Sequence, residues 1–163
     1  MRMTAYMELL AENQPWNLIA FMVVPMVLAE TLVAAEFFLL LGTNQEREKC
    51  LKTFTRAMGF VLAAYYLAIL TYFALNVLNQ IEWQGWIDVT AIVAFALAVF
   101  PAFAVAVYGL DLSREKLKRH FVSLIVYLVF AHLAMIFGML DPGLGSEPPQ
   151  EHNHSMMEHH HHH

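Results

Sequence analysis

Cysteine and charge are both scarce in this chain, and each scarcity excludes a class of protein. Cys50 is the only cysteine, so a disulfide framework and a cysteine-based metal site are both excluded. Charged residues make up 14% of the sequence and hydrophobic residues 59%, whereas a soluble domain is about a quarter charged. The composition therefore indicates a membrane protein.

Motifs for several common chemistries are also missing. The sequence shows no glycine-rich phosphate loop, no nucleophile triad and no nucleic-acid-binding pattern. These absences favour a protein that is not an enzyme without deciding the question, and we expect no nucleic-acid partner. An internal repeat is missing too, which weakens the case for a transporter built from inverted repeats.

The chain has instead a set of long apolar runs. A helix that spans a bilayer needs about 20 predominantly apolar residues. Four runs meet this requirement, at about 17–41, 57–78, 87–110 and 120–140. Short connections make sequential helices antiparallel neighbours. The predicted fold is therefore all-α, a four-transmembrane-helix up-down bundle over residues 17–141.

Two features of these runs predict local geometry. Pro25 lies inside the first helix and is expected to kink it, freeing a backbone carbonyl one turn earlier. The third helix carries Ala91, Ala94, Ala98 and Ala102 on one face. Small residues allow helices to approach closely in lipid, so this face is expected to pack against a neighbour.

The flanking segments are predicted to lie outside the bundle. Residues 1–16 contain an amphipathic stretch with apolar residues at helical spacing, which is typical of a helix lying on the membrane interface. Residues 142–157 form a polar tail with His and Met that is too poor in apolar residues to fold alone. Residues 158–163 are interpreted as a purification tag and are excluded from fold reasoning.

Lysine and arginine are distributed unevenly along the chain. Eight of the nine lie in the first and third loops, and the second loop and the tail have none. Because basic loops stay on the cytoplasmic side, we expect both termini on the opposite side of the membrane.

The first apolar run carries two carboxylates, Glu30 and Glu36. A charge at membrane depth is costly, so an intramembrane acid indicates a functional site by default. Met22, Met26 and Glu30 are spaced four residues apart and therefore share one face of the helix. Glu36 returns near that face.

A matching stripe is predicted on the fourth helix, which runs the opposite way. His132, Met135 and Met139 follow one another at helical spacing. With a rise of about 1.5 Å per residue, Met135 is expected at the depth of Met22 on the first helix. By the same reckoning His132 and Met26 lie about one turn deeper.

Thioether and imidazole groups together are a ligand set for Cu(I), a soft cation. The tail repeats both groups outside the apolar runs. We therefore predict a Cu(I) site in the outer half of the bundle, extended by the tail, with these candidate ligands: Met22, Met26, Glu30, His132, Met135, Met139, His152 and His154.

Each of these residues also has a simpler interpretation. Methionine is a common filler in apolar helices, so Met22 and Met26 can be packing residues. A buried imidazole in lipid needs a partner, and a hydrogen bond from His132 to Glu30 or to a tyrosine would satisfy it without a metal. The His/Met pattern of the tail overlaps in part with the tag. Both interpretations stay open at this stage.

A series of polar side chains suggests a proton or polar path through the bundle. For the stripe on the second helix, hydrogen bonding between helices is the favoured interpretation. The path would run from the cytoplasmic end to the outer mouth through Glu36, Tyr65, Tyr72, Asn76, Asp88 and Asp141. Such a series would suit a quinone site. A haem b held by His132 and Met26 is a further alternative.

Three stretches carry a resemblance to a known group of proteins. They are NQPWN at 13–17, AETLVAAE at 29–36 and AHLAMIFGMLDP at 131–142. With them the chain resembles a small family of bacterial four-helix membrane proteins, usually labelled permease or left without a function, that often end in His/Met-rich tails. The resemblance implies a location in the bacterial inner membrane and no established activity. Together with the positive-inside rule, this location predicts that both termini are periplasmic.

The sequence thus leads to one expected function and two alternatives. We expect an inner-membrane protein that binds, sequesters or transfers Cu(I). The alternatives are a redox protein that interacts with quinone or haem, alone or as a subunit of a larger complex, and a small-solute permease. The expected partners are the lipid bilayer, a periplasmic metal donor or acceptor, and further copies of the chain or a larger membrane complex.

Overall fold

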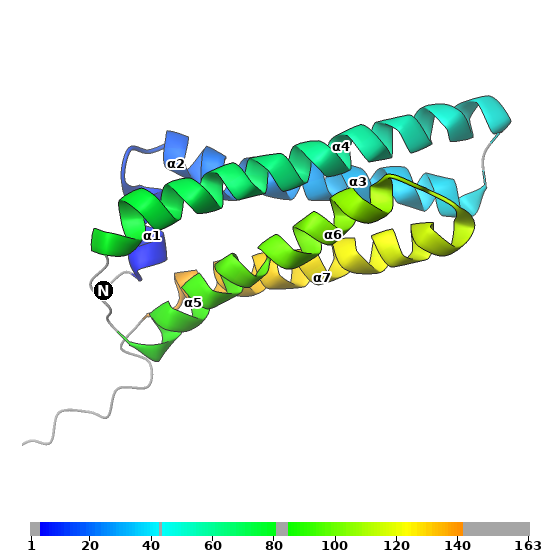
Figure 1. Cartoon of the computed structure of the whole chain (residues 1–163). Helices are drawn as coiled ribbons and strands as arrows, with labels where there is room; N and C mark the ends of the chain where they lie inside the picture. Colours follow the sequence, from blue (N-terminus) through cyan, green and yellow to red (C-terminus); the bar gives the residue numbers. More distant parts are fainter. Residues whose placement is uncertain (1–3, 43, 81–84, 142–163) are drawn as a thin grey trace, which may run out of the picture.

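The chain folds as a bundle of four long antiparallel helical spans (Figure 1). The computed structural model describes residues 4–42, 44–80 and 85–141. Within these residues four spans are long and apolar enough to cross a membrane, and no strand occurs. The spans are Trp16–Leu41, Gln45–Val77, Trp86–Gly109 and Arg114–Met139. The prediction of an all-helical bundle of four spanning helices is confirmed.

Several spans contain more than one helical element. Along the chain the elements are α1 (Ala5–Ala11), α2 (Trp16–Leu18), the π-helix η1 (Ile19–Val23), α3 (Val24–Leu41), α4 (Gln45–Tyr72), the π-helix η2 (Phe73–Val77), the 3₁₀-helix η3 (Leu78–Gln80), α5 (Trp86–Leu97), α6 (Val99–Gly109) and α7 (Arg114–Met139). Figure 1 shows α1 and α2 at one end of the bundle and the turns joining α3 to α4 and α6 to α7 at the other. These are called the α1 end and the basic-loop end.

Prolines accompany two of the changes in helical geometry. Pro25 follows directly after the π-helical turn η1, and Pro101 follows the break between α5 and α6 at Ala98. Proline lacks the amide hydrogen that an α-helix needs at that position, so both sites depart from regular helix. The hydroxyl of Tyr65 donates to the carbonyl oxygen of Ala20 within η1, at 2.9 Å. This bond satisfies a backbone group in the irregular turn and links two spans.

Two helices begin earlier than the apolar runs predict. α4 begins at Gln45, well before the predicted start at 57, and α7 begins at Arg114 rather than at 120. Both added segments are rich in Glu, Lys and Arg, which favour helix. Ion pairs of i,i+4 spacing support them, between Lys52 and Glu48 at 2.7 Å and between Arg119 and Glu115 at 3.0 Å. The apolar run marks the membrane-spanning part of a helix and not its full length.

α1 packs into the bundle, whereas the sequence predicted a helix on the membrane interface. Tyr6, Leu9 and Leu10 are buried, and α1 contacts α2, α5 and α7. The hydroxyl of Thr4 donates to the carbonyl oxygen of Gly138 at the end of α7. An amphipathic helix can bury its apolar face against protein as well as lipid, and here the bundle provides that surface.

The interior and the outer surface of the bundle differ in side-chain size. Ala91, Ala94, Ala98 and Ala102 are all buried, as the small-residue face of the third span predicted, and α5 and α6 both pack against α7. Large apolar side chains such as Phe100 are exposed on the outside of the spans. An apolar outer surface on apolar spanning helices is typical of a protein surrounded by lipid tails.

Candidate functional site

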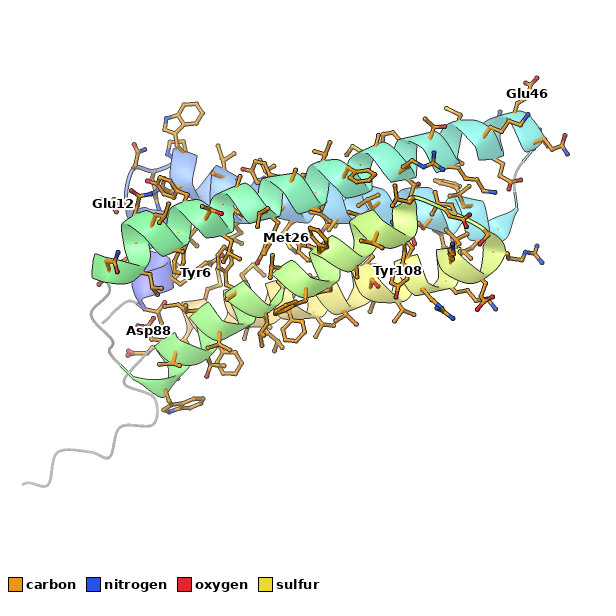
Figure 2. All side chains as sticks on the ribbon, viewed as in Figure 1. Tyr6, Glu12, Met26, Glu46, Asp88 and Tyr108 are labelled. Atoms are coloured by element: carbon orange, nitrogen blue, oxygen red, sulfur yellow. The ribbon has the colours of Figure 1, made fainter. Side chains whose placement is uncertain are left out.

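The interior of the bundle holds two polar or metal-ligating groupings, one toward each end. The first is a small cavity, here called the methionine cavity, of about 20 Å³. Met22 from η1, Met26 from α3 and Met135 from α7 line it, and Figure 2 shows Met26 near the middle of the bundle's length. The structure therefore brings together three of the predicted ligands.

Aromatic side chains complete the wall of the methionine cavity. Tyr6, Phe21, Tyr66, Phe95 and Tyr127 all line it. The hydroxyl of Tyr66 donates to the carbonyl oxygen of Phe95 at 2.6 Å, and the rings of Tyr66 and Tyr127 lie edge to face with centroids 5.4 Å apart. The hydroxyl of Tyr127 is buried and has no hydrogen-bond partner among the described residues. Buried hydroxyls are normally satisfied, so this hydroxyl is available to a small ligand.

α1 closes the methionine cavity from its own end of the bundle. Tyr6 lines the cavity, stacks at a tilt on Phe95 with ring centroids 5.8 Å apart, and lies against Gly138 of α7. Burial raises the pKa of the Tyr6 phenol to about 12, because removing the group from water disfavours its charged form. The Tyr6 phenol is therefore in its neutral form when α1 is packed against the bundle.

Three other predicted ligands do not line the methionine cavity. Glu30 and His132 are exposed on the outside of the bundle, and Met139 is 59% exposed. The Nδ1–H of His132 donates to the carbonyl oxygen of Leu128, one turn earlier on α7, at 2.7 Å. The helical stripes were predicted from spacing alone, and the structure turns only part of each stripe inward. The tail residues His152 and His154 lie outside the described residues.

The residues of the predicted polar path do not form one connected series. Tyr65 makes the hydrogen bond to Ala20 described above, as the favoured interpretation of hydrogen bonding between helices predicts. Asn76 donates to the carbonyl oxygen of Tyr72 within its own helix at 3.1 Å, and Tyr72 is half exposed. Asp88 is buried at the start of α5, and Asp141 follows α7; both belong to the α1 end.

The second grouping is a buried acid–imidazole pair at the basic-loop end, and sequence reasoning found only half of it. Glu36 of α3 and His120 of α7 are both fully buried. The Nδ1–H of the His120 imidazole donates to Oε1 of the Glu36 carboxylate. Oε2 of Glu36 and Nε2 of His120 have no partner among the described residues. The pair therefore retains one free polar atom on each member.

Helix α4 and helix α6 enclose this pair with small residues. Gly59 of α4 and Gly109 of α6 lie so close to the imidazole that a Cβ built on either would be 3.6 or 3.4 Å from Nε2 of His120. Thr55 lies one turn before Gly59, and its buried hydroxyl also has no partner among the described residues. Arg56 follows Thr55 on α4, and its Nε–H donates to the carbonyl oxygen of Gly109 at 3.2 Å.

A depth comparison at the basic-loop end would have found His120. Glu36 lies shortly before the end of α3, and His120 lies shortly after the start of α7. Antiparallel helices place such positions at similar depth. The sequence prediction compared depths only in the outer half of the bundle, and treated the basic segment before 120 as a loop that left His120 at the membrane edge.

The ionisable residues of the described chain do not cluster as ligands of a hard or borderline metal would. No group of three or more His, Cys, Asp or Glu side chains comes together in residues 4–42, 44–80 and 85–141. Zn²⁺ and Ca²⁺ sites normally use such groups. The potential metal ligands that the structure does bring together in this part of the chain are the thioethers of Met22, Met26 and Met135.

Comparison with known proteins gives a family and no described relative. No curated protein and no solved structure matches the chain. Residues 1–154 match a family described as a family of unknown function, DUF6803. The match includes all the described residues of both groupings, the methionine cavity and the Glu36–His120 pair. The chain therefore belongs to the DUF6803 family of unknown function.

Proposed function

We propose that this protein binds Cu(I) in the methionine cavity and sequesters or transfers the ion at the outer half of the bacterial inner membrane. The observation that carries the proposal is the convergence of Met22, Met26 and Met135 on one cavity from three elements. Thioether sulfur is a soft ligand that selects Cu(I) over the hard divalent cations. The proposed ligand set is thus narrower than the sequence alone suggested.

The charge and size of the cavity favour a small monovalent ion. No carboxylate lines it, so a divalent cation would be buried without compensation, which costs far more than burying a single charge. A volume of about 20 Å³ is room for roughly one water-sized sphere, which needs about 10–15 Å³. A haem or a quinone ring does not fit this space, so we place those alternatives second.

The surrounding aromatic rings and the free hydroxyl support the same ion. Phe21, Tyr66 and Phe95 surround the cavity, and a cation near the face of an aromatic ring is stabilised by about 0.5–2 kcal/mol. The unpartnered oxygen of Tyr127 adds a neutral donor. Methionine packing alone explains the thioethers, but it gives no role to the unpartnered hydroxyl of Tyr127.

The topology proposal follows from the charges of the loops. All four Lys/Arg of the described first loop segment and all four of the third loop segment lie at the basic-loop end. The positive-inside rule then places the α1 end and the methionine cavity on the periplasmic side. A periplasmic donor or acceptor could exchange the ion there, with His152 and His154 of the tail as intermediate ligands.

The exposed ionisable residues favour a protein neighbour in the membrane. Glu30 and His132 are exposed within two apolar spans. An ionisable group at membrane depth is costly against lipid and is less so against protein. We propose a homo-oligomer or a larger membrane complex that covers this face.

The test is anaerobic loading with Cu(I), followed by desalting against a competing chelator and elemental analysis of the tag-free protein. We expect about one Cu per chain, retained when His152 and His154 are changed to Ala. The combined variant Met22→Leu, Met26→Leu and Met135→Leu keeps side-chain volume nearly constant and is expected to lose the copper.

The matched control is Met139→Leu, because Met139 lies four residues after Met135 on α7 but is exposed. This variant is expected to bind copper as the wild type does. Circular dichroism confirms that each variant keeps its helices. Copper stoichiometry that survives the triple Leu variant would refute ligation by the methionine cavity.

A further inference from the structure

We infer that Glu36 and His120 form an intramembrane proton-binding site near the basic-loop end of the bundle. This inference rests on the buried pair and is independent of the proposed copper site, because the two groupings share no residue. The ligand is a single proton delivered by water.

The hydrogen bonds of the pair leave several buried polar atoms unused. Nδ1 of His120 and Oε1 of Glu36 satisfy each other. Nε2 of His120, Oε2 of Glu36 and Oγ1 of Thr55 have no partner among the described residues. More than about 90% of buried polar groups in folded proteins have one. Three such atoms, placed on three helices at one end of the bundle, indicate a site for a small hydrogen-bonding ligand.

The glycines leave limited space beside the free imidazole nitrogen. A Cβ at Gly109 would contact Nε2 at 3.4 Å and one at Gly59 at 3.6 Å, which are ordinary van der Waals distances. The space beside each glycine is therefore about the size of a methyl group. A methyl group is similar in size to one water molecule and is much smaller than the set of ligands that a metal ion requires.

The number of protons on the pair determines its net charge. With one proton shared between Nδ1 and Oε1, the carboxylate is charged, the imidazole is neutral, and the pair carries a net charge of −1. A proton added at Nε2 converts it to an imidazolium–carboxylate pair with no net charge. A net charge buried in a low-dielectric interior is costly, and the added proton removes that net charge.

The charged groups near the pair come from α4 and α7. From α4 the guanidinium of Arg56 lies beside Gly109. α6 contains no Asp, Glu, Lys, Arg or His, and its one titratable side chain is Tyr108. From α3 the facing acid is Glu36 itself, and Asp88 of α5 is at the opposite end of the bundle (Figure 2). On α7 itself the exposed Lys116, Lys118 and Arg119 lie within four residues of His120. Together with Arg56 they are the positive charges that oppose protonation.

The position of the pair gives it a short route to water. His120 lies less than two turns after Arg114, the first residue of α7, which is about 9 Å along the helix axis. Glu36 lies within two turns of the end of α3. Histidine is the side chain whose ordinary titration falls nearest neutral pH, and ionisable residues within membrane spans commonly serve as proton relays.

The test is a pH titration of ¹⁵N-histidine-labelled, tag-free protein in lipid bicelles, followed by the imidazole ¹⁵N shifts. His120→Gln assigns the resonances. We expect Nε2 of His120 to gain a proton as the pH falls while Nδ1 stays hydrogen-bonded. Glu36→Gln is expected to move the titration midpoint, because it removes the negative charge that the proton neutralises.

Matched controls and a second variant keep the test decisive. Glu30→Gln changes an exposed acid on the same helix and is expected to leave the His120 titration unchanged. If Glu36→Gln does not fold, Gly59→Ala places a methyl group beside Nε2 and is expected to slow proton exchange there. The inference would be overturned if Nε2 of His120 never gains a proton while the wild-type protein stays folded. It would also be overturned if the titration midpoint shifts equally in Glu30→Gln and Glu36→Gln.

Discussion

The Glu36–His120 pair leads to a quantitative prediction about stability. The variants are Glu36→Leu, His120→Leu and the double change. Each single change leaves the other member buried without its hydrogen-bond partner, since both side chains are fully buried and Nδ1–Oε1 is their one mutual contact. Removing one partner of a buried pair costs about 3–5 kcal/mol, whereas replacing both by apolar residues of similar volume is often nearly neutral.

These values predict strong coupling between the two positions. If each single change costs about 3 kcal/mol and the double change about 1 kcal/mol, the two effects fall short of additivity by roughly 5 kcal/mol. Even for a pair that carries no net charge, the coupling energy should be at least about 2 kcal/mol, because each buried polar group left without a partner costs about 1–3 kcal/mol. The double variant should therefore be more stable than either single variant.

The assay is reversible unfolding in mixed micelles with a rising fraction of denaturing detergent, followed by far-UV circular dichroism. Glu30→Leu, His132→Leu and their double variant serve as the control cycle, because these residues lie on the same two spans but are exposed. The control effects should add within about 0.5 kcal/mol. If the changes at Glu36 and His120 add in the same way, the buried pair is not the energetic unit that we describe.

Two further predictions concern the docking of α1. Gly138→Ala would place a Cβ 2.6 Å from Cδ1 of Tyr6, so overpacking of about 1–3 kcal/mol should loosen α1 and speed hydrogen exchange of its amides; unchanged exchange would contradict this packing. The second follows from the pKa of Tyr6, about 12 in the folded protein against about 10 when exposed. The free energy of docking should be unaffected below about pH 10 and should fall by about 1.4 kcal/mol per pH unit between about 10 and 12. The measurement is the tyrosinate absorbance of the wild type as the pH rises. The Tyr6→Phe variant is the control and should lack the transition that belongs to Tyr6.

Much of the fold could be predicted because lipid restricts the choices of the backbone. A chain in hydrocarbon must satisfy its own backbone hydrogen bonds, so long apolar runs become helices. Short connections then make them antiparallel. The helix ends were harder to predict: the charged segment from Gln45 to Arg56 is helical, although it would not be apolar enough to span. Hydropathy indicates which part of a helix lies in lipid. The ends of the helix depend instead on the helix propensity of the flanking residues and on their ion pairs.

Residue spacing along a helix does not predict which side chains of a stripe face the interior of the bundle. A stripe at helical spacing has a width of about a third of the circumference, and which edge of it faces inward depends on the rotation of the helix. The structure turns Met135 toward the cavity and leaves Met139 outside. The same rotation of α3 buries Glu36 and exposes Glu30. No periodicity within a single helix distinguishes the members of these two pairs.

The sequence by itself determined the spanning helices, their order, the charge difference between the two ends, and the identity of most chemically active side chains. Only the tertiary structure decided which of them meet. Helix rotation and depth are set by packing against neighbours, such as the glycines that admit the imidazole of His120. Packing depends on all helices at once, because in lipid close contact between surfaces, and not hydrophobicity, selects the faces that associate.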